Sequence, residues 1–424
     1  MKLTSRLFVV AVVLIIFYQA QQAAFAQGVM LRSTGAVNAA VGGTATAMPI
    51  DAAGALQWNP GSISALKKNE MTFGLELVQP KSSVSTSGVP IIPAHPLLGV
   101  NRNGTTKGES GVTPVPNMAF VWSTSPRSPF TYGIGMAAVG GASSLYPQDG
   151  GNLMLSQHGR SATVIVLQVT PTVSVQLTER LSVGVAPIID LASLNINPMS
   201  LGRSLSPDTS LTTYGTRYVW GGGFQIGGLY DFQNHFKAGF MFKSPIWAEK
   251  LYFTGIDGTT TTRQDATFQL NLPMTLSAGI SYDGFRDTIV GMDVRYLDYA
   301  NAAGLDQGLS GTTVKGLDWD SVFSINLGLE RKINHRLKGR LGYCWNENPI
   351  PDRSSALCIS APMITQHVFS CGFGYSFAKN LELSAAYCHA FEAKVSGTTH
   401  TAAGGTVTNV LSANSLFAGL TKKW

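Results

Sequence analysis

The sequence predicts an all-β protein: a transmembrane antiparallel up-and-down β-barrel of about fourteen strands. Three observations support this. Apolar residues alternate with small or polar ones along many segments, the connections between these segments are alternately long and short, and charged residues are few. Only 13% of the residues are charged, against roughly 25% in soluble proteins.

The alternation is clearest at residues 268–282, where every second residue is apolar and the residues between are small, polar or turn-forming. Successive strand side chains point to opposite faces, so this segment predicts one strand with an apolar and a wettable face. It would span roughly 50 Å at about 3.3 Å per residue, far more than the ~17–20 Å of a soluble strand. A bilayer suits such a strand, and a large β-sandwich is the alternative.

Residues 1–26 have the three regions of a secretory signal peptide. Two basic residues precede an apolar run at 7–17, which is shorter than the roughly 20 residues of a transmembrane helix. Ala24-Phe25-Ala26 follows as a small-residue cleavage motif. We expect cleavage after Ala26, which leaves Gln27 first and lowers the formal net charge from +6 to +4. This charge is diffuse, so we expect no nucleic-acid partner.

Residues 27–68 are predicted to form a compact apolar segment, which we call the hatch. Apolar residues are spread here among glycines and alanines without strand alternation, and a turn lies near the end, so the segment needs a cavity to bury it. The residues that we expect to shape the hatch are Gly35, Gly42, Gly43, Trp58, Asn59 and Pro60.

Residues 69–424 are predicted to form the barrel. Long external loops and short periplasmic turns are typical of such barrels, and an even strand count places both chain ends on the periplasmic side. The terminal Trp424 suits the interfacial aromatic girdle. The candidate strands are 69–78, 115–123, 130–140, 161–176, 181–195, 215–231, 235–255, 264–282, 286–299, 319–331, 337–345, 366–377, 381–395 and 409–424.

Several residues are candidates for binding a ligand. Alternation directs Arg295 and Arg340 into the lumen, where a guanidinium can pair with a carboxylate; alternatively, both neutralise lumen acids or hold the hatch. Apolar clusters in the long loops are candidates for ligand capture, because exposed apolar patches usually bind something, or they pack on one another or on the hatch. These loop residues are Ile91, Ile92, Leu97, Leu98, Leu153, Met154, Leu155 and Met199.

The third strand carries Gly140 and Gly141 at its end. Paired glycines favour a bulge or kink in a strand, and close packing against the hatch is the alternative.

Enzyme and metal motifs are weak. Residues 133–138 match a loose dinucleotide fingerprint without the required helix, and the seven histidines are scattered. The four cysteines, Cys344, Cys358, Cys371 and Cys388, lack metal-ligand spacing, and an exported chain could pair them in three ways. The alternation places Cys371 and Cys388 on opposite registers, which argues against that pair. We expect no enzyme activity, no metal and no cofactor.

Separate patches of sequence resemble one family in order along the chain. Residues 340–343, 348–353 and 372–375, with Pro362 and His367, resemble the C-terminal third of the FadL/TodX outer-membrane transporters of long-chain fatty acids and aromatic hydrocarbons. Residues 33–35, 51–52 and 59–61 resemble that family's plug segment, with Gly61 where the family carries alanine, and residues 272–273 and 277–279 look similar too.

The resemblance implies a fourteen-stranded barrel whose N-terminal hatch plugs the lumen. It also implies that external loops capture an apolar ligand, which passes to a site near the hatch and leaves sideways through the kinked third strand. We therefore expect outer-membrane passage of hydrophobic small molecules, with long-chain fatty acids first and aromatic hydrocarbons as the alternative. A general diffusion porin and a surface adhesin or structural barrel are the other candidates. The expected partners are this ligand, outer-membrane lipid and lipopolysaccharide, and the expected oligomeric state is a monomer.

Overall fold

The computed structural model describes residues 27–66, 68–89, 102–125, 127–200, 211–213, 217–257, 260–310, 313–401 and 404–424. The expected signal peptide lies outside them. No helix within these ranges is long and apolar enough to cross a bilayer.

Fourteen antiparallel strands close into one barrel, as predicted. Each strand pairs with its neighbour in the sequence, and β1 closes the barrel by pairing with β21 from Glu70–Lys423 to Ser87–Thr406. The barrel strands are β1 (Glu70–Ser87), β3 (Thr113–Trp122), β4 (Phe130–Tyr146), β5 (Arg160–Gln176), β6 (Leu181–Asn197), β8 (Arg217–Asp231), β9 (Phe236–Lys243), β13 (Met274–Phe285), β14 (Thr288–Asp298), β17 (Val322–Lys332), β18 (Leu337–Asn346), β19 (His367–Ala378), β20 (Leu381–Thr398) and β21 (Thr406–Lys423).

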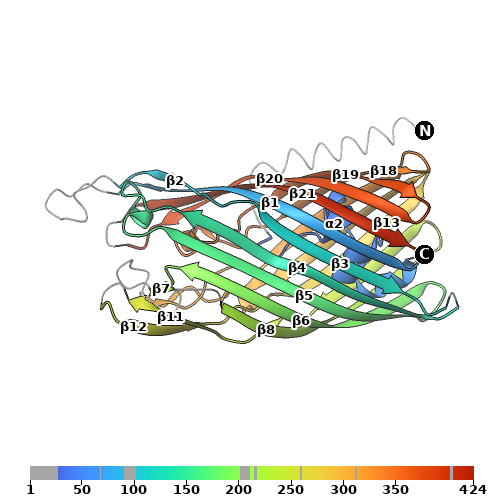
Figure 1. The fold of residues 1–424 in the computed structure, drawn as a ribbon, viewed down its shortest axis with the longest axis horizontal. Coiled ribbons are helices and arrows are strands. Elements are labelled where there is room, and N and C mark those ends of the chain that lie inside the picture. The colour runs from blue at the N-terminus through green and yellow to red at the C-terminus, as the bar shows by residue number, and fades with distance from the viewer. Residues whose placement is uncertain are drawn as a thin grey trace.

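Smaller elements gather at the end of the barrel that carries the long loops. There β7, β11 and β12 form a separate sheet, opposite the end where the C-terminus lies (Figure 1). The smaller elements are β2 (Thr105–Lys107), β7 (Leu211–Thr213), β10 (Trp247–Ala248), β11 (Leu251–Asp257), β12 (Arg263–Phe268), β15 (Leu309–Ser310), β16 (Thr313–Val314), and the 3-10 turns η3 (Leu153–Leu155), η5 (Tyr299–Asn301) and η6 (Asp352–Ser354).

The predicted single strand at 268–282 is wrong in its first part. β12 ends at Phe268 and β13 begins at Met274, and Leu270 and Leu272 are buried in the apolar cluster beneath the loops. Pro273 explains the break, because proline has no N–H for a strand ladder. From Met274 onward the alternation holds: Ile280 is 57% exposed on the outer wall, and the small residues between face the lumen.

The predicted strand at 235–255 is also divided. β9 ends at Lys243, and Pro245 follows at once. The Ser244 side chain accepts a hydrogen bond from the Phe224 N–H at 3.0 Å, in place of a regular ladder partner. The chain still pairs with β8 through β10, and it then forms β11 and β12 outside the barrel sheet before it returns as β13.

The hatch lies inside the barrel (Figure 1). It contains α2 (Gly35–Ala40), α3 (Ala52–Trp58) and the 3-10 turn η2 (Pro60–Ala65). α2 packs against β19 to β21, and η2 packs against β5, β6 and β8. Backbone meets backbone where a Cβ on Gly342 would overlap the amide nitrogen of Gly42, whose φ is +67°. Glycine permits both the close approach and the left-handed conformation.

Candidate functional site

The barrel wall opens between β3 and β4. Their ladder runs from Trp122–Tyr132 to Asn117–Ala137 and stops there. Beyond that point β4 continues to Tyr146, while β3 continues to Thr113 paired with β1 alone. The two strands therefore leave a lateral gap in the half of the barrel nearer the long loops.

Two prolines explain why the ladder stops. Pro114 and Pro116 are in register with β1, but they cannot donate hydrogen bonds to it. The donors to β1 must therefore be the residues between them, so the two proline nitrogens face β4. Because proline has no N–H, β3 offers no donor at the two positions where its pairing with β4 would continue.

The hatch covers part of the exposed edge of β4. Val29 to Leu31 lie along it: the Leu31 N–H donates to the Val139 carbonyl at 2.8 Å, and the Gly141 N–H donates to the Val29 carbonyl at 3.2 Å. The ladder of β4 with β5 shifts register between Ala138 and Gly140. Gly140 and Gly141, the predicted kink residues, thus lie where the wall is irregular and the chain's first described residues pair with it.

A cavity of about 440 Å³ lies behind the gap. Its lining is mainly apolar and comes from the hatch, both sides of the gap, β5, β20, β21 and the loop before β19. Two charged residues, Arg32 and Glu76, reach it. The lining residues include Met30, Leu31, Val78, Pro114, Val115, Pro116, Ala138, Ala142, Val164, Leu167, Met363, Val368, Ala390 and Leu411.

Arg32 is the cation of this cavity. Its Nη2 donates to the Thr365 hydroxyl, and its Nε is buried without a hydrogen-bond partner among the described residues. Glu76 reaches the same cavity from β1 with only 8% of its surface exposed. An unsatisfied buried donor costs about 1–3 kcal/mol, so an acceptor entering the cavity gains by meeting Arg32.

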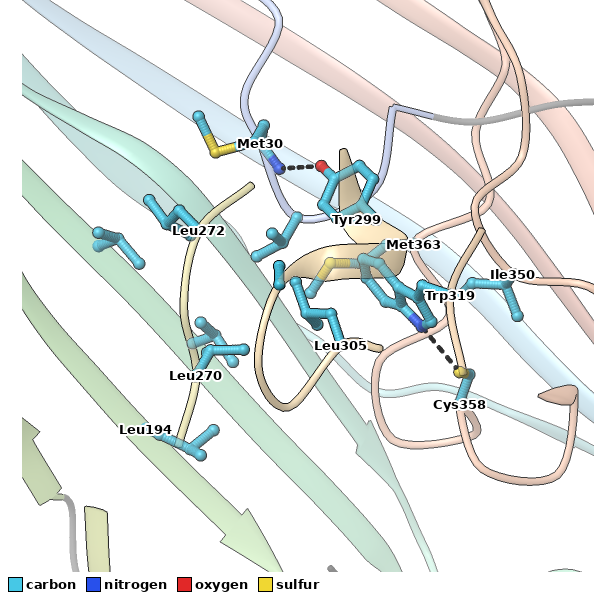
Figure 2. Packing of buried hydrophobic residues seen from close by; sticks show 14 of the residues in the cluster. Met30, Leu194, Leu270, Leu272, Tyr299, Leu305, Trp319, Ile350, Cys358 and Met363 are labelled. Atoms are coloured by element: carbon cyan, nitrogen blue, oxygen red, sulfur yellow. Dashed lines mark hydrogen bonds between the residues drawn. The ribbon is translucent and has the colours of Figure 1, made fainter. Parts of the chain in front are cut away.

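An apolar cluster from the loops surrounds the start of the hatch (Figure 2). The Tyr299 hydroxyl donates to the Gln27 carbonyl at 2.5 Å and accepts from the Met30 N–H at 3.3 Å. Trp319 packs edge-on to Tyr299, with 5.3 Å between ring centroids, and donates to the Cys358 sulfur at 3.3 Å. The segment that borders the gap is thus tied directly to one of the long loops.

Arg295 holds the hatch. Its guanidinium stacks 3.4 Å from the centre of the Trp58 ring and donates to the Gly43 carbonyl at 2.5 Å. It also pairs with Asp293 at 3.1 Å, and that carboxylate accepts hydrogen bonds from the Ala45 and Thr46 amides. A buried guanidinium stacked on an indole is a strong cation–π contact.

Asn59 and Pro60 complete the docking of the hatch. The Asn59 amide donates to the Thr46 carbonyl at 2.7 Å and to the Gly228 carbonyl of β8 at 2.9 Å. Its oxygen accepts from the Gly61 N–H at 3.0 Å. Pro60 follows as the first residue of η2, where proline's fixed φ suits a helical start.

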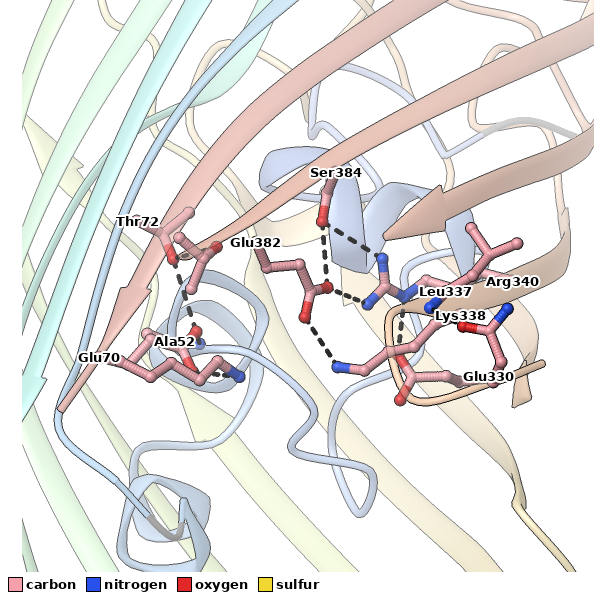
Figure 3. A network of polar contacts seen from close by, with 12 residues as sticks. Ala52, Glu70, Thr72, Glu330, Leu337, Lys338, Arg340, Glu382 and Ser384 are labelled. Atoms are coloured by element: carbon pink, nitrogen blue, oxygen red, sulfur yellow. Dashed lines mark hydrogen bonds and ion pairs between the residues drawn. The ribbon is translucent and has the colours of Figure 1, made fainter. Parts of the chain in front are cut away.

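Arg340 belongs to a charge network in the wall (Figure 3). It pairs with Glu330 at 2.7 Å and with Glu382 at 2.8 Å, and Lys338 pairs with Glu382 at 2.9 Å. On the opposite side of Figure 3, the Glu70 carboxylate accepts from the Ala52 N–H of α3 at 2.8 Å. Neither Arg340 nor Arg295 lines the cavity.

The predicted loop residues that the structure describes do not line the cavity. Leu153 to Leu155 form η3, and Met154, Leu155 and Met199 are buried in the loop cluster rather than lining the cavity. Ile91, Ile92, Leu97 and Leu98 lie outside the described residues. Arg32, Glu76 and the two prolines of β3 were missed from the sequence. The one signal that could have found the opening is the Thr113-Pro114-Val115-Pro116 pattern, which marks an unpaired strand edge.

We expect Asp51 to make hatch docking depend on pH. Its carboxylate caps α3 by accepting from the Gly54 N–H at 3.3 Å, and its second oxygen is buried without a partner in the described chain. Burial, and next the charge of Glu70, raise the pKa of Asp51 from 3.8 to about 7. The docked hatch therefore keeps this proton over a pH range in which a released hatch loses it.

Docking is expected to weaken as pH rises from about 4 to about 7, by on the order of 4 kcal/mol in total, with no further loss from this group at higher pH. Asp51→Asn should abolish this part of the dependence, because asparagine caps a helix but does not ionise. Hydrogen exchange of the α3 amides between pH 5 and 8, corrected for intrinsic rates, measures it. Asp287→Asn, in an exposed turn, is the control; equal slopes for all three proteins would contradict the assignment.

Comparison with known proteins places this geometry in context. A family model described as outer membrane protein transport protein (OMPP1/FadL/TodX) matches residues 15–422. No curated protein matches the sequence significantly. Similar solved structures include the P. putida toluene transporter TodX (17% identity, TM-score 0.70), a Pseudomonas aeruginosa FadL homologue (16%, 0.71) and the Ralstonia pickettii toluene transporter TbuX (15%, 0.66). Each comparison covers 93% of this chain and 99% of the other. At these identities the likeness shows a shared fold.

Proposed function

Because this chain belongs to the OMPP1/FadL/TodX family of outer-membrane transport proteins, we propose that the hydrophobic compounds it carries are long-chain fatty acids. The extracellular loops capture the ligand, which then rests in the cavity beside Arg32 and leaves sideways between β3 and β4 into the bilayer. One observation carries this proposal: the same cavity touches Arg32 at the hatch and the residues on both sides of the wall gap.

The sideways route follows from the physical chemistry of an apolar cargo. The hatch occupies the axial path, and its contacts with the wall are polar and tight. The path to the gap is lined mainly by apolar side chains, and transfer of each CH₂ from water to such a surface is worth about 0.8 kcal/mol. The ligand therefore stays in contact with apolar surface until it meets lipid.

Arg32 gives the cavity a place for a carboxylate. Its buried Nε has no partner within the described residues, and a charge-assisted hydrogen bond to a carboxylate is roughly twice as strong as a neutral one. The tail would then extend along the apolar lining toward the gap. In this arrangement Arg295 and Arg340 keep the hatch and wall in place rather than meeting the ligand.

Substitution Arg32→Met is expected to lower oleate uptake by about 10- to 100-fold, because a hydrogen bond to a charged group contributes about 1.5–3 kcal/mol, while toluene uptake stays near that of the native chain. Methionine keeps an apolar stem of similar length. Arg353→Met, which removes an exposed loop arginine paired with Asp318 and Asp320, is the control. An equal loss for both solutes would instead indicate a damaged hatch.

Aromatic hydrocarbons are the second candidate, and a specific observation favours them. Glu76 enters the same cavity as Arg32, so the two charges can neutralise each other and leave the cavity suited to an uncharged ligand. Two of the similar solved structures are described as toluene transporters.

Uptake of labelled oleate and labelled toluene by cells with and without the chain decides between these cargoes. If oleate uptake depends on the chain, the first proposal is supported. If only toluene uptake depends on the chain, the second is supported. If neither solute enters faster with the chain than without it, the transport proposal is wrong for both classes.

A further inference from the structure

The first described residues lie against two aromatic side chains, Tyr299 and Trp319, which Figure 2 shows close to Met30. Gln27 is 1% exposed, and its carbonyl accepts the Tyr299 hydroxyl at 2.5 Å. Gly28 follows with φ +69°, and a Cβ on it would lie 2.8 Å from the Tyr299 ring and 2.9 Å from the Trp319 ring. Residues 27 and 28 are therefore wedged against two rings that are themselves buried.

The polar atoms of the Gln27 side chain are not satisfied there. Both its amide nitrogen and its amide oxygen are buried without a hydrogen-bond partner in the described structure. Each such buried group costs about 1–3 kcal/mol. A primary amide with two N–H donors is thus a poor occupant of this site, although the backbone around it is well held.

The expected cleavage after Ala26 raises the cost of burying residue 27, because Gln27 would then carry the α-amino group. The contacts of this segment include the two rings, the Tyr299 hydroxyl and the backbone edge of β4. An α-ammonium brought into this site would lose its hydration. Burial of an unpaired charge costs far more than burial of a neutral amide.

We propose that Gln27 of the mature chain is a modification site and is cyclised to pyroglutamate. The α-amino nitrogen attacks the side-chain Cδ, the N–Cδ bond forms, the Cδ–Nε2 bond breaks, and Nε2 leaves as ammonia with a proton from the amine. No oxidant or other reactant is needed. The product is a neutral five-membered lactam, so both the ammonium charge and the unsatisfied NH₂ group disappear in one step.

This modification fits the role of the segment in closing the wall. Val29 to Leu31 pair with β4 immediately after Gln27, and a charged, hydrated terminus would be pulled away from the apolar cluster. A neutral ring lets residues 27 and 28 stay against Tyr299 and Trp319. The reaction would precede docking, because the amine must be free to attack before the rings enclose it.

Mass spectrometry of the full chain from outer membranes tests the proposal, which rests on cleavage after Ala26. Trypsin should release residues 27–32 as the N-terminal peptide, ending at Arg32. The expected peptide is lighter than the unmodified sequence by one ammonia, and it resists Edman degradation until pyroglutamyl aminopeptidase removes its first residue.

Two controls make the result decisive. A heavy-isotope synthetic peptide with open Gln27, added before digestion, reports any cyclisation caused by handling. Gln27→Ala has no amide to lose, so its N-terminal peptide should show no loss of ammonia. Recovery of residue 27 mainly as an open glutamine would overturn the proposal. A mature terminus at any other residue would do the same.

Discussion

Removing residues 27–64 is expected to turn an occluded barrel into an ion-conducting one. The hatch fills the lumen through α2, α3 and η2, and its anchors reach many strands, among them Asn59 to β8 and Arg295 of β14 to Gly43. Without it the lumen would be lined by the small and polar inward residues of the strands, and water would enter. Steady conductance in planar bilayers should rise at least about tenfold, as befits a water-filled barrel of this class.

A milder substitution separates loss of the plug from misfolding. Asn59→Ala removes the hydrogen bonds to Thr46 and Gly228 but keeps the hatch in the chain, so it should give brief openings rather than steady conductance. Heat-modifiable migration on gels checks that each barrel is folded. A native chain that already conducts steadily would instead support the general diffusion porin.

Sealing the wall gap is expected to abolish uptake of hydrophobic compounds without loosening the hatch. Ala142 lines the cavity on β4, and Ala142→Trp would place an indole across the path between cavity and gap. Uptake should fall at least about tenfold, which corresponds to a barrier increase of about 1.4 kcal/mol. Ala418→Trp, on the lipid-facing side of β21 where the ladders to β1 and β20 are continuous, should leave uptake unchanged.

A second way of closing the gap adds no bulky side chain to the cavity, so it tests the route independently. The double substitution Pro114→Val and Pro116→Val returns two N–H donors to the edge of β3 that faces β4, so β3 can pair with β4 past Asn117 and Ala137 in place of residues 29–31. Uptake should again fall, while oleate binding to the purified protein is retained. Full uptake through both closed forms would exclude the lateral route.

The alternation of apolar and small or polar residues was sufficient to predict most of the barrel wall. In β13 and β21, outward Ile280 and Leu420 and the small inward residues between them follow the alternation, because a strand has no other way to divide its side chains between lipid and lumen. The same rule failed at Leu270 and Leu272. They keep the period of two, yet they lie in a loop that packs on Ile246 and the buried cluster.

For the charged residues too, the alternation predicts some features and misses others. Alternation directs Arg295 and Arg340 into the barrel, and both are buried there together with Asp293, Glu330 and Glu382. It does not say which of them meet each other, which meet the hatch and which remain open to a ligand. Arg32 lies outside any strand, so no alternation of residues marks it. Its position in the cavity follows only from the path of the chain from Met30, which Tyr299 holds, to the start of α2.

The sequence by itself determined that this chain is a membrane barrel with a plug, because period-two alternation and a low content of charge are properties of neighbouring residues that a bilayer selects. Tertiary structure alone decided where the wall opens, which cation faces the cavity and what holds the first residues of the hatch. Those features depend on pairing between segments far apart in the chain, such as Val29 with Gly141 or Arg32 with Thr365. No local periodicity encodes such contacts, because closure of the barrel around its hatch is what brings them together.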